Sequence, residues 1–122
     1  MEENFDRDRR QTPRYKMIDV AAVVGERRLG HVLDMSVGGM AFSYLQMQRE
    51  DLEEIELGII FGQNGQYLDK LPVEIISDSI LSHGPVHHPV VVRRRSLRFV
   101  DLDDEQMEKL REFIRAHAKG SL

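Results

Sequence analysis

The stretch RRQTPR at positions 9–14 places Arg10 and Arg14 four residues apart, with Pro13 between them. A planar guanidinium group can form paired hydrogen bonds to phosphate oxygens or to the O6 and N7 atoms of guanine. Two arginines at this spacing in an extended, proline-stiffened arm can reach both sides of a ligand. Taken alone, the same stretch also fits a solvated basic tail, and that alternative stays open.

The stretch DMSVGGM at positions 34–40 combines acceptor, hydroxyl and backbone chemistry. The Asp34 carboxylate can accept two N–H groups at once, as the N1 and N2 atoms of guanine offer them, and Ser36 can donate or accept. Gly38 and Gly39 are expected to allow positive φ and close approach of a ligand to the backbone. The alternative is a Ser-type turn that closes a hairpin, with the glycines serving only its geometry.

Short hydrophobic runs of β type, separated by turn residues, are expected to position these groups. The expected strands are 17–24, 28–35, 39–45, 54–61, 67–80 and 90–100. In the fourth run, alternation predicts one hydrophobic face formed by Ile55, Leu57, Ile59 and Phe61. Pro72 cannot donate to a ladder, so an edge or a bulge is expected there.

The period changes at the C-terminus, where 103–120 has the spacing of an amphipathic helix. Asp103 and Gln106 form the pattern of a capping box, and Gly120 is the expected C-cap. These elements predict a mainly β fold: a small six- to seven-stranded antiparallel β-barrel with a C-terminal α-helix. We expect a flexible arm at 1–13, which carries the start of the arginine motif, and the barrel with its helix at 14–120.

The composition limits the function classes. A chain of 122 residues forms one domain, and no apolar run approaches the roughly 20 residues that a membrane span needs. With no cysteine and irregularly spaced histidines in the loop 82–89, no metal and no cofactor are expected. No nucleotide-hydrolysing loop, nucleophile elbow or metalloprotease motif is present, so an enzyme is not expected. A cytoplasmic location fits these features.

Together, the two motifs resemble those of the PilZ domain, a bacterial receptor family for the second messenger cyclic di-GMP. The resemblance extends over RRQTPRYKMIDVAAVV, GHVLDMSVGGMAF and SLRFVDLDDEQMEKLREFI, while residues 46–90 match only in strand rhythm. One departure is Ser96, where the family often has a glycine ahead of the last strand. The expected ligand-binding residues are Arg9, Arg10, Arg14, Asp34, Ser36, Gly38 and Gly39.

The resemblance implies a role for each motif residue. Arg10 and Arg14 would clamp phosphates and guanine edges, and Asp34 would recognise guanine through N1 and N2. Ser36 would hydrogen-bond the ligand, and Gly39 would permit its approach to the backbone.

The arginine ahead of the first motif, Arg9, implies two intercalated ligand molecules. An arm that folds over the ligand would change the exposed surface, and a separate, unidentified protein effector would then recognise the bound state.

Two other functions remain open. The first is a PilZ-like structural adaptor that binds no nucleotide, although the intact motifs argue against it. The second is a small β-barrel that binds single-stranded nucleic acid, but the net charge of −4 and the aromatic content of 7% argue against that function. The run RRRSLR at 93–98 either adds positive potential beside the site or forms the solvent face of a strand.

Overall fold

The computed structural model describes residues 13–25, 28–47, 56–83 and 90–121. Arg9, Arg10 and most of the expected arm therefore lie outside the described residues. The strands are β1 (Tyr15–Met17), β2 (Val20–Val24), β3 (Arg28–Met35), β4 (Gly39–Met47), β5 (Leu57–Gly62), β6 (Tyr67–Leu68), β7 (Val73–His83), β8 (Val90–Phe99) and β9 (Ala118–Ser121). The α-helix of the described residues, α2 (Asp104–His117), precedes β9.

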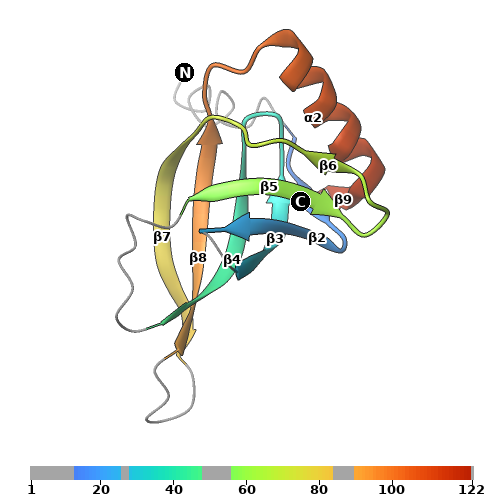
Figure 1. Cartoon of the computed structure of the whole chain (residues 1–122). Helices are drawn as coiled ribbons and strands as arrows, with labels where there is room; N and C mark the ends of the chain where they lie inside the picture. The colour runs from blue at the N-terminus through green and yellow to red at the C-terminus, as the bar shows by residue number, and fades with distance from the viewer. Residues whose placement is uncertain (1–12, 26–27, 48–55, 84–89, 122) are drawn as a thin grey trace, which may run out of the picture.

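All strand pairs are antiparallel, and the main path through the sheet runs β6-β5-β2-β3-β4-β8-β7. The short strand β1 adds to β3 and carries β9 on its other side. The sheet bends so that β5 and β2 cross the direction of β4, β8 and β7, which gives a barrel-like shape with α2 at one end (Figure 1). Within the described residues the path stays open between its two end strands, β6 and β7. The prediction of a mainly β, barrel-like fold with a C-terminal helix is confirmed.

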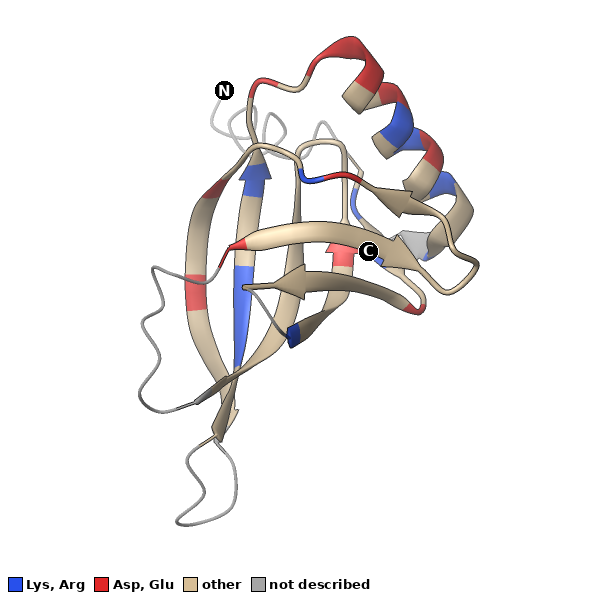
Figure 2. Cartoon of the chain, in the orientation of Figure 1, with Lys and Arg blue, Asp and Glu red and all other residues tan. Residues whose placement is uncertain are grey.

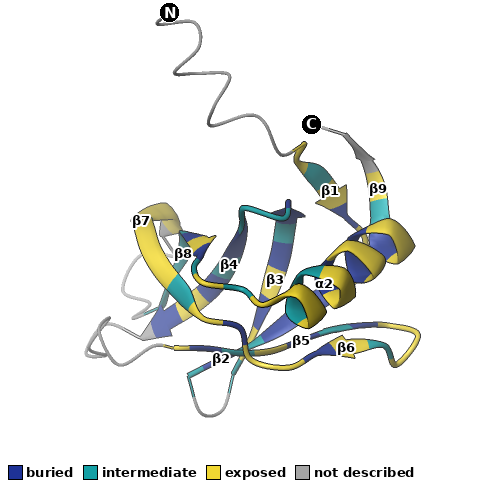
Figure 3. Cartoon of the chain, turned by 90° about the horizontal axis from the view of Figure 1, so that it is seen from above, coloured by how far each residue is buried: buried dark blue, intermediate teal, exposed yellow. Residues whose placement is uncertain are grey.

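The core fills the concave side of this bent sheet. Met40, Phe42 and Tyr44 of β4 are all buried, as their alternation predicts. From the helix, Leu110, Phe113 and Ile114 join the same core, while the opposite face of α2 is exposed (Figure 3). The helix therefore covers the end of the barrel beside β1 and β6.

The described residues form nine strands rather than six or seven, because two expected strands are interrupted and residues 118–121 form a strand that was not expected. The expected strand 17–24 breaks at Asp19, whose φ of 54° no strand can accommodate. The expected strand 67–80 breaks ahead of Pro72, so β6 and β7 are separate. That interruption agrees with the irregularity expected at the proline.

The helix begins as predicted and ends earlier. The Asp103 side chain accepts a hydrogen bond from the Gln106 backbone N–H at 2.7 Å, and the Gln106 side chain accepts one from the Asp103 backbone N–H at 2.9 Å. These two bonds confirm the predicted capping box. The predicted C-cap at Gly120 is wrong, because the helix ends at His117 and Ala118 is the cap. Residues 118–121 instead pair with β1 as β9, so pairing with a distant strand outweighs the local glycine signal.

The expected hydrophobic face of β5 is also wrong in part. Ile60 is fully buried, whereas Ile59 is 42% exposed. Against β2, Val24 pairs with Leu57 and Ala22 pairs with Ile60, so β5 holds one extra residue between the two pairs. Such a bulge reverses the side on which the following side chains lie.

A buried ionic cluster joins β4, β7 and β8. The Asp78 carboxylate of β7 accepts from Tyr44 Oη at 2.6 Å, from Arg93 Nε at 2.5 Å and from Arg95 Nε at 2.8 Å. The Arg95 guanidinium also lies 5.5 Å from the centre of the Tyr44 ring. One carboxylate therefore holds one buried and one half-buried arginine. Figure 2 shows acidic positions on β7 beside a basic stretch of β8.

The cluster changes the acidity of its members. Burial by itself raises the pKa of Asp78, but the hydrogen bonds from Tyr44, Arg93 and Arg95 outweigh it and hold the pKa below its ordinary value of 3.8. Burial, followed by the hydrogen bond to Asp78, raises the pKa of Tyr44 to about 12. Both shifts favour the ionised aspartate and the neutral phenol at neutral pH.

The substitution Asp78→Asn should lower the free energy of unfolding at neutral pH by about 3–5 kcal/mol, because it removes the carboxylate that pairs with buried Arg95 and half-buried Arg93. The native contribution of Asp78 is present above pH 3.8 and is lost as the pH falls through the lower folded-state pKa. Urea unfolding across this acid range should show that loss in the native chain and its absence in the variant.

The matched control is Glu74→Gln, which removes an exposed ion pair with Arg98 and should cost about 0–1 kcal/mol. Equal costs for the two variants would contradict the role given to Asp78.

Candidate ligand-binding site

A single bulge in β3 directs Asp34 away from the core. Val32 pairs with Phe42 and Asp34 pairs with Ala41, so Leu33 is an extra residue with no direct partner on β4. In a regular strand Asp34 would lie on the same face as the buried Val32. The bulge instead places the carboxylate on the convex face of the sheet, as bulges near functional sites commonly do.

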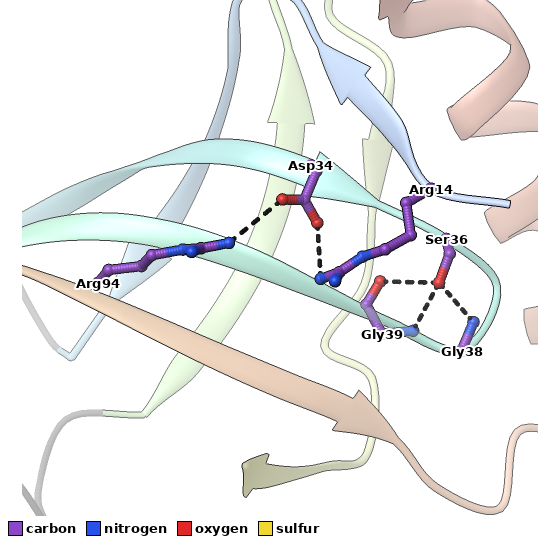
Figure 4. Close-up of polar contacts among 6 residues, drawn as sticks. All are labelled: Arg14, Asp34, Ser36, Gly38, Gly39 and Arg94. Atoms are coloured by element: carbon purple, nitrogen blue, oxygen red, sulfur yellow. Dashed lines mark hydrogen bonds and ion pairs between the residues drawn. The ribbon is translucent and has the colours of Figure 1, made fainter. Parts of the chain in front are cut away.

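Arg14 reaches this carboxylate because β1 pairs with β3. Tyr15 is opposite Met35 and Lys16 is opposite Asp34, which brings the residue just before β1 alongside the end of β3. Arg14 Nη2 lies 2.9 Å from Asp34 Oδ1, and the exposed fractions of the two side chains are 49% and 6%. The pairing of two strands thus joins the second arginine of one motif to the aspartate of the other (Figure 4).

A third participant, Arg94 of β8, approaches from the opposite side. Its Nη2 lies 3.5 Å from Asp34 Oδ2, at the long limit of a hydrogen bond. The alternation of β8 separates the basic run: Arg93 and Arg95 face the Asp78 cluster, whereas Arg94 lies beside Asp34. The sequence left two interpretations of this run open, and the alternation of β8 was the signal that could have singled out Arg94.

The polar groups of this site are incompletely satisfied. Asp34 Oδ1 is buried and accepts no hydrogen bond from the described residues, although Arg14 Nη2 lies 2.9 Å from it as an ion pair. Arg94 Nε is likewise buried and has no acceptor among the described residues. Unsatisfied buried polar atoms are rare in folded proteins. Their presence in one ion-paired group indicates a place where a further polar partner fits.

Ser36 organises the turn between β3 and β4. Its Oγ accepts from the N–H groups of Gly38 at 3.0 Å and Gly39 at 3.1 Å, and the Ser36 N–H donates to the Gly39 carbonyl at 2.8 Å. Ser36 is buried, with 4% of its surface exposed. These bonds form the Ser-type turn that the sequence analysis gave as the alternative. The turn begins directly after β3, close to the bulge that places Asp34 on the convex face.

The two glycines of the motif do not have the expected backbone conformation. The glycines with positive φ in the described chain are Gly25 and Gly65, and neither Gly38 nor Gly39 is among them. Gly39 is required for another reason: a Cβ atom there would lie 2.2 Å from the Leu97 carbonyl oxygen of β8. The close approach that the structure shows at Gly39 is therefore between two strands.

The structure brings together Arg14, Asp34 and the Ser36 turn, and adds Arg94. Two guanidinium groups beside one carboxylate leave a net positive charge, which suits an anionic ligand. The described residues hold no group of three or more acidic or histidine side chains that could bind a metal ion. In that part of the chain, no helix has the length and apolar character to cross a membrane.

The PilZ domain family model matches residues 8–116 of the chain. The chain belongs to the PilZ family. Among solved structures, it is similar to one described as the PilZ domain with c-di-GMP of YcgR from Escherichia coli, with a TM-score of 0.61 and 20% identity. The match covers 89% of this chain and 91% of that one, and at this identity it shows a common fold. No curated protein matches the chain.

The substitution Gly39→Ala should destabilise this PilZ domain by about 1–3 kcal/mol, because the added methyl group meets a backbone carbonyl that cannot rotate away. Chemical unfolding of the ligand-free protein measures this cost. The matched control is Gly58→Ala in β5, where the nearest atom, Val23 Cβ, is 3.3 Å away, so that a shift of a few tenths of an ångström relieves the contact. If Gly39→Ala proved no more costly than the control, the close contact with β8 would be refuted.

Proposed function

We propose that this PilZ domain is a bacterial cytoplasmic receptor that binds cyclic di-GMP on the convex face of β3, β4 and β8. The observation that carries the proposal is the incompletely hydrogen-bonded group of Asp34 and Arg94 beside Arg14. Guanine provides the N–H donors that the Asp34 oxygen lacks, and the two phosphates provide acceptors for guanidinium groups. The fold shared with a PilZ domain whose structure contains c-di-GMP supports the same ligand class.

The roles follow from the position of each group. Asp34 would accept the N1 and N2 hydrogens of one guanine, and Arg14 would turn from the carboxylate toward a phosphate or a guanine edge. Arg94 would stabilise negative charge on the β8 side of the ligand. Ser36 would hold the turn and offer its hydroxyl to the ligand, while Gly38 and Gly39 keep this rim free of side chains.

The N-terminal arm supplies the remaining part of the proposal. Arg10 would complete the clamp with Arg14, and Arg9 would favour two intercalated ligand molecules. Ordering of the arm over the ligand would create a surface that a separate effector protein recognises. No catalytic role, metal or cofactor is part of this proposal.

Calorimetric titration with cyclic di-GMP tests the site directly. Losing a charge-assisted hydrogen bond removes about 1.5–3 kcal/mol, so Arg14→Ala, Asp34→Ala and Arg94→Ala should each weaken binding by about one to two orders of magnitude. The matched control is Arg98→Ala, because Arg98 also lies on β8 but pairs with Glu74. The same titration measures the number of ligand molecules bound per chain, which is expected to be two if Arg9 has the proposed role.

Three outcomes would contradict parts of this proposal. No binding by the folded, nucleotide-free native chain would overturn the receptor function and favour the adaptor. If Arg94→Ala bound cyclic di-GMP no more weakly than the control Arg98→Ala, the proposed role of Arg94 in binding would be refuted. Salt-sensitive binding of oligonucleotides, without binding of cyclic di-GMP, would favour the nucleic-acid alternative.

Amide hydrogen exchange tests the arm. We expect exchange of residues 5–16 to slow on addition of saturating cyclic di-GMP, because those amides would gain hydrogen bonds or lose contact with water. The control is the Asp34→Ala variant at the same ligand concentration, where the protection should disappear. Unchanged exchange in a native sample that is saturated by calorimetry would refute the arm mechanism while leaving the binding site intact.

A further inference from the structure

Strand β7 combines an unpaired edge with an unusually apolar surface. Its hydrogen-bonding partner is β8, and among the described residues its other edge pairs with nothing. A cavity of about 400 Å³, lined in part by Leu57 of β5 and by Val73 and Ile75 of β7, lies in the open seam. Unpaired edges offer free backbone N–H and C=O groups to another strand, and proteins usually protect them with charged side chains.

The protection expected of such an edge is weak in β7. Four of the nine large hydrophobic side chains exposed in the described chain are on this strand, with exposed fractions of 45–64%. They are Ile75, Ile76, Ile80 and Leu81. The two acids of the strand already have partners, since Glu74 pairs with Arg98 and Asp78 belongs to the buried cluster. The edge therefore presents aliphatic side chains between residues whose charges are compensated.

The order of residues in β7 is nearly the same in both directions. Around Asp78, residues 75–81 read I-I-S-D-S-I-L. If two copies of β7 pair antiparallel about a twofold axis at Asp78, Ile76 lies opposite Ile80 of the other copy and Ser77 lies opposite Ser79. Every aliphatic residue then meets an aliphatic residue, which is the self-complementarity that a twofold interface requires.

We propose that β7 is a dimerisation edge, and that its partner is β7 of a second copy of this chain. The Asp78 carboxylate on the axis is bound by three side chains of its own copy and needs no partner across the interface. Ile76 and Leu81 are the extra residues of two bulges in the pairing of β7 with β8. Such bulges bend the strand, so only a short stretch around Asp78 is expected to pair with the second copy. Interfaces below about 1,200 Å² are typical of weak complexes, so a reversible dimer is expected.

Sedimentation of the full chain over a wide concentration range tests the proposal. The native chain should pass from monomer to dimer as its concentration rises, and Ile76→Lys should raise the dissociation constant by at least about a hundredfold, because the change occurs twice in a symmetric interface. The control is Leu29→Lys on β3, where the side chain is 62% exposed and dimerisation should be unchanged. Circular dichroism checks that both variants fold.

Cysteine cross-linking tests the register. Residues opposite each other in an antiparallel pair have Cα atoms about 4.5–5.5 Å apart, within the range for a disulfide. Since the native chain has no cysteine, a Ser77→Cys chain mixed with a Ser79→Cys chain should form mixed disulfides in preference to either self-linked product. A monomer at every concentration, or disulfides without this preference, would overturn the proposal.

This inference is independent of the ligand. Cyclic di-GMP binding by Ile76→Lys should equal that of the native chain, because β8 separates β7 from the Arg14–Asp34 site. A native chain that binds ligand but stays monomeric would refute the dimer alone.

Discussion

The extra residue in β3 is the constraint on which the candidate site depends. If Leu33 were not an extra residue in β3, Asp34 would lie on the same face as Val32 and would point into the core beside Phe42. A lone carboxylate in that core would be too costly to keep ionised. With the bulge, the same residue lies on the convex face, within reach of one arginine from the N-terminal side and one from β8.

The rest of the sheet keeps this carboxylate in place. β1 fixes Arg14 through its pairing with β3, and the contact between Gly39 and the Leu97 carbonyl fixes the β3–β4 turn against β8. The Asp78 cluster acts on the other face of β8, where it holds Arg93 and Arg95 inward. Because side chains alternate along a strand, that inward constraint also determines that Arg94 faces Asp34.

Much of the fold was predictable from patterning, because strand alternation and helix capping are local. The faces of Met40, Phe42 and Tyr44 and the capping box at Asp103 follow from neighbouring residues alone. The bulges in β3 and β5 were not predictable in this way, since each is defined by its register with another strand. For the same reason, the early end of α2 depends on the distant strand β1, and Arg94 becomes part of the site only when β8 is placed beside β4.

The incomplete hydrogen bonding at Asp34 has a physical explanation in this framework. Arg14 approaches one carboxylate oxygen from the residue before β1, and Arg94 approaches the other from β8, so neither guanidinium group pairs with both oxygens. A stable core would not retain such a group without compensation, because an unsatisfied buried polar atom costs about 1–3 kcal/mol. A ligand with both N–H donors and anionic oxygens would satisfy the carboxylate and the arginines together. The same strand pairings that leave the ligand-free site incomplete would then hold it in the geometry for binding.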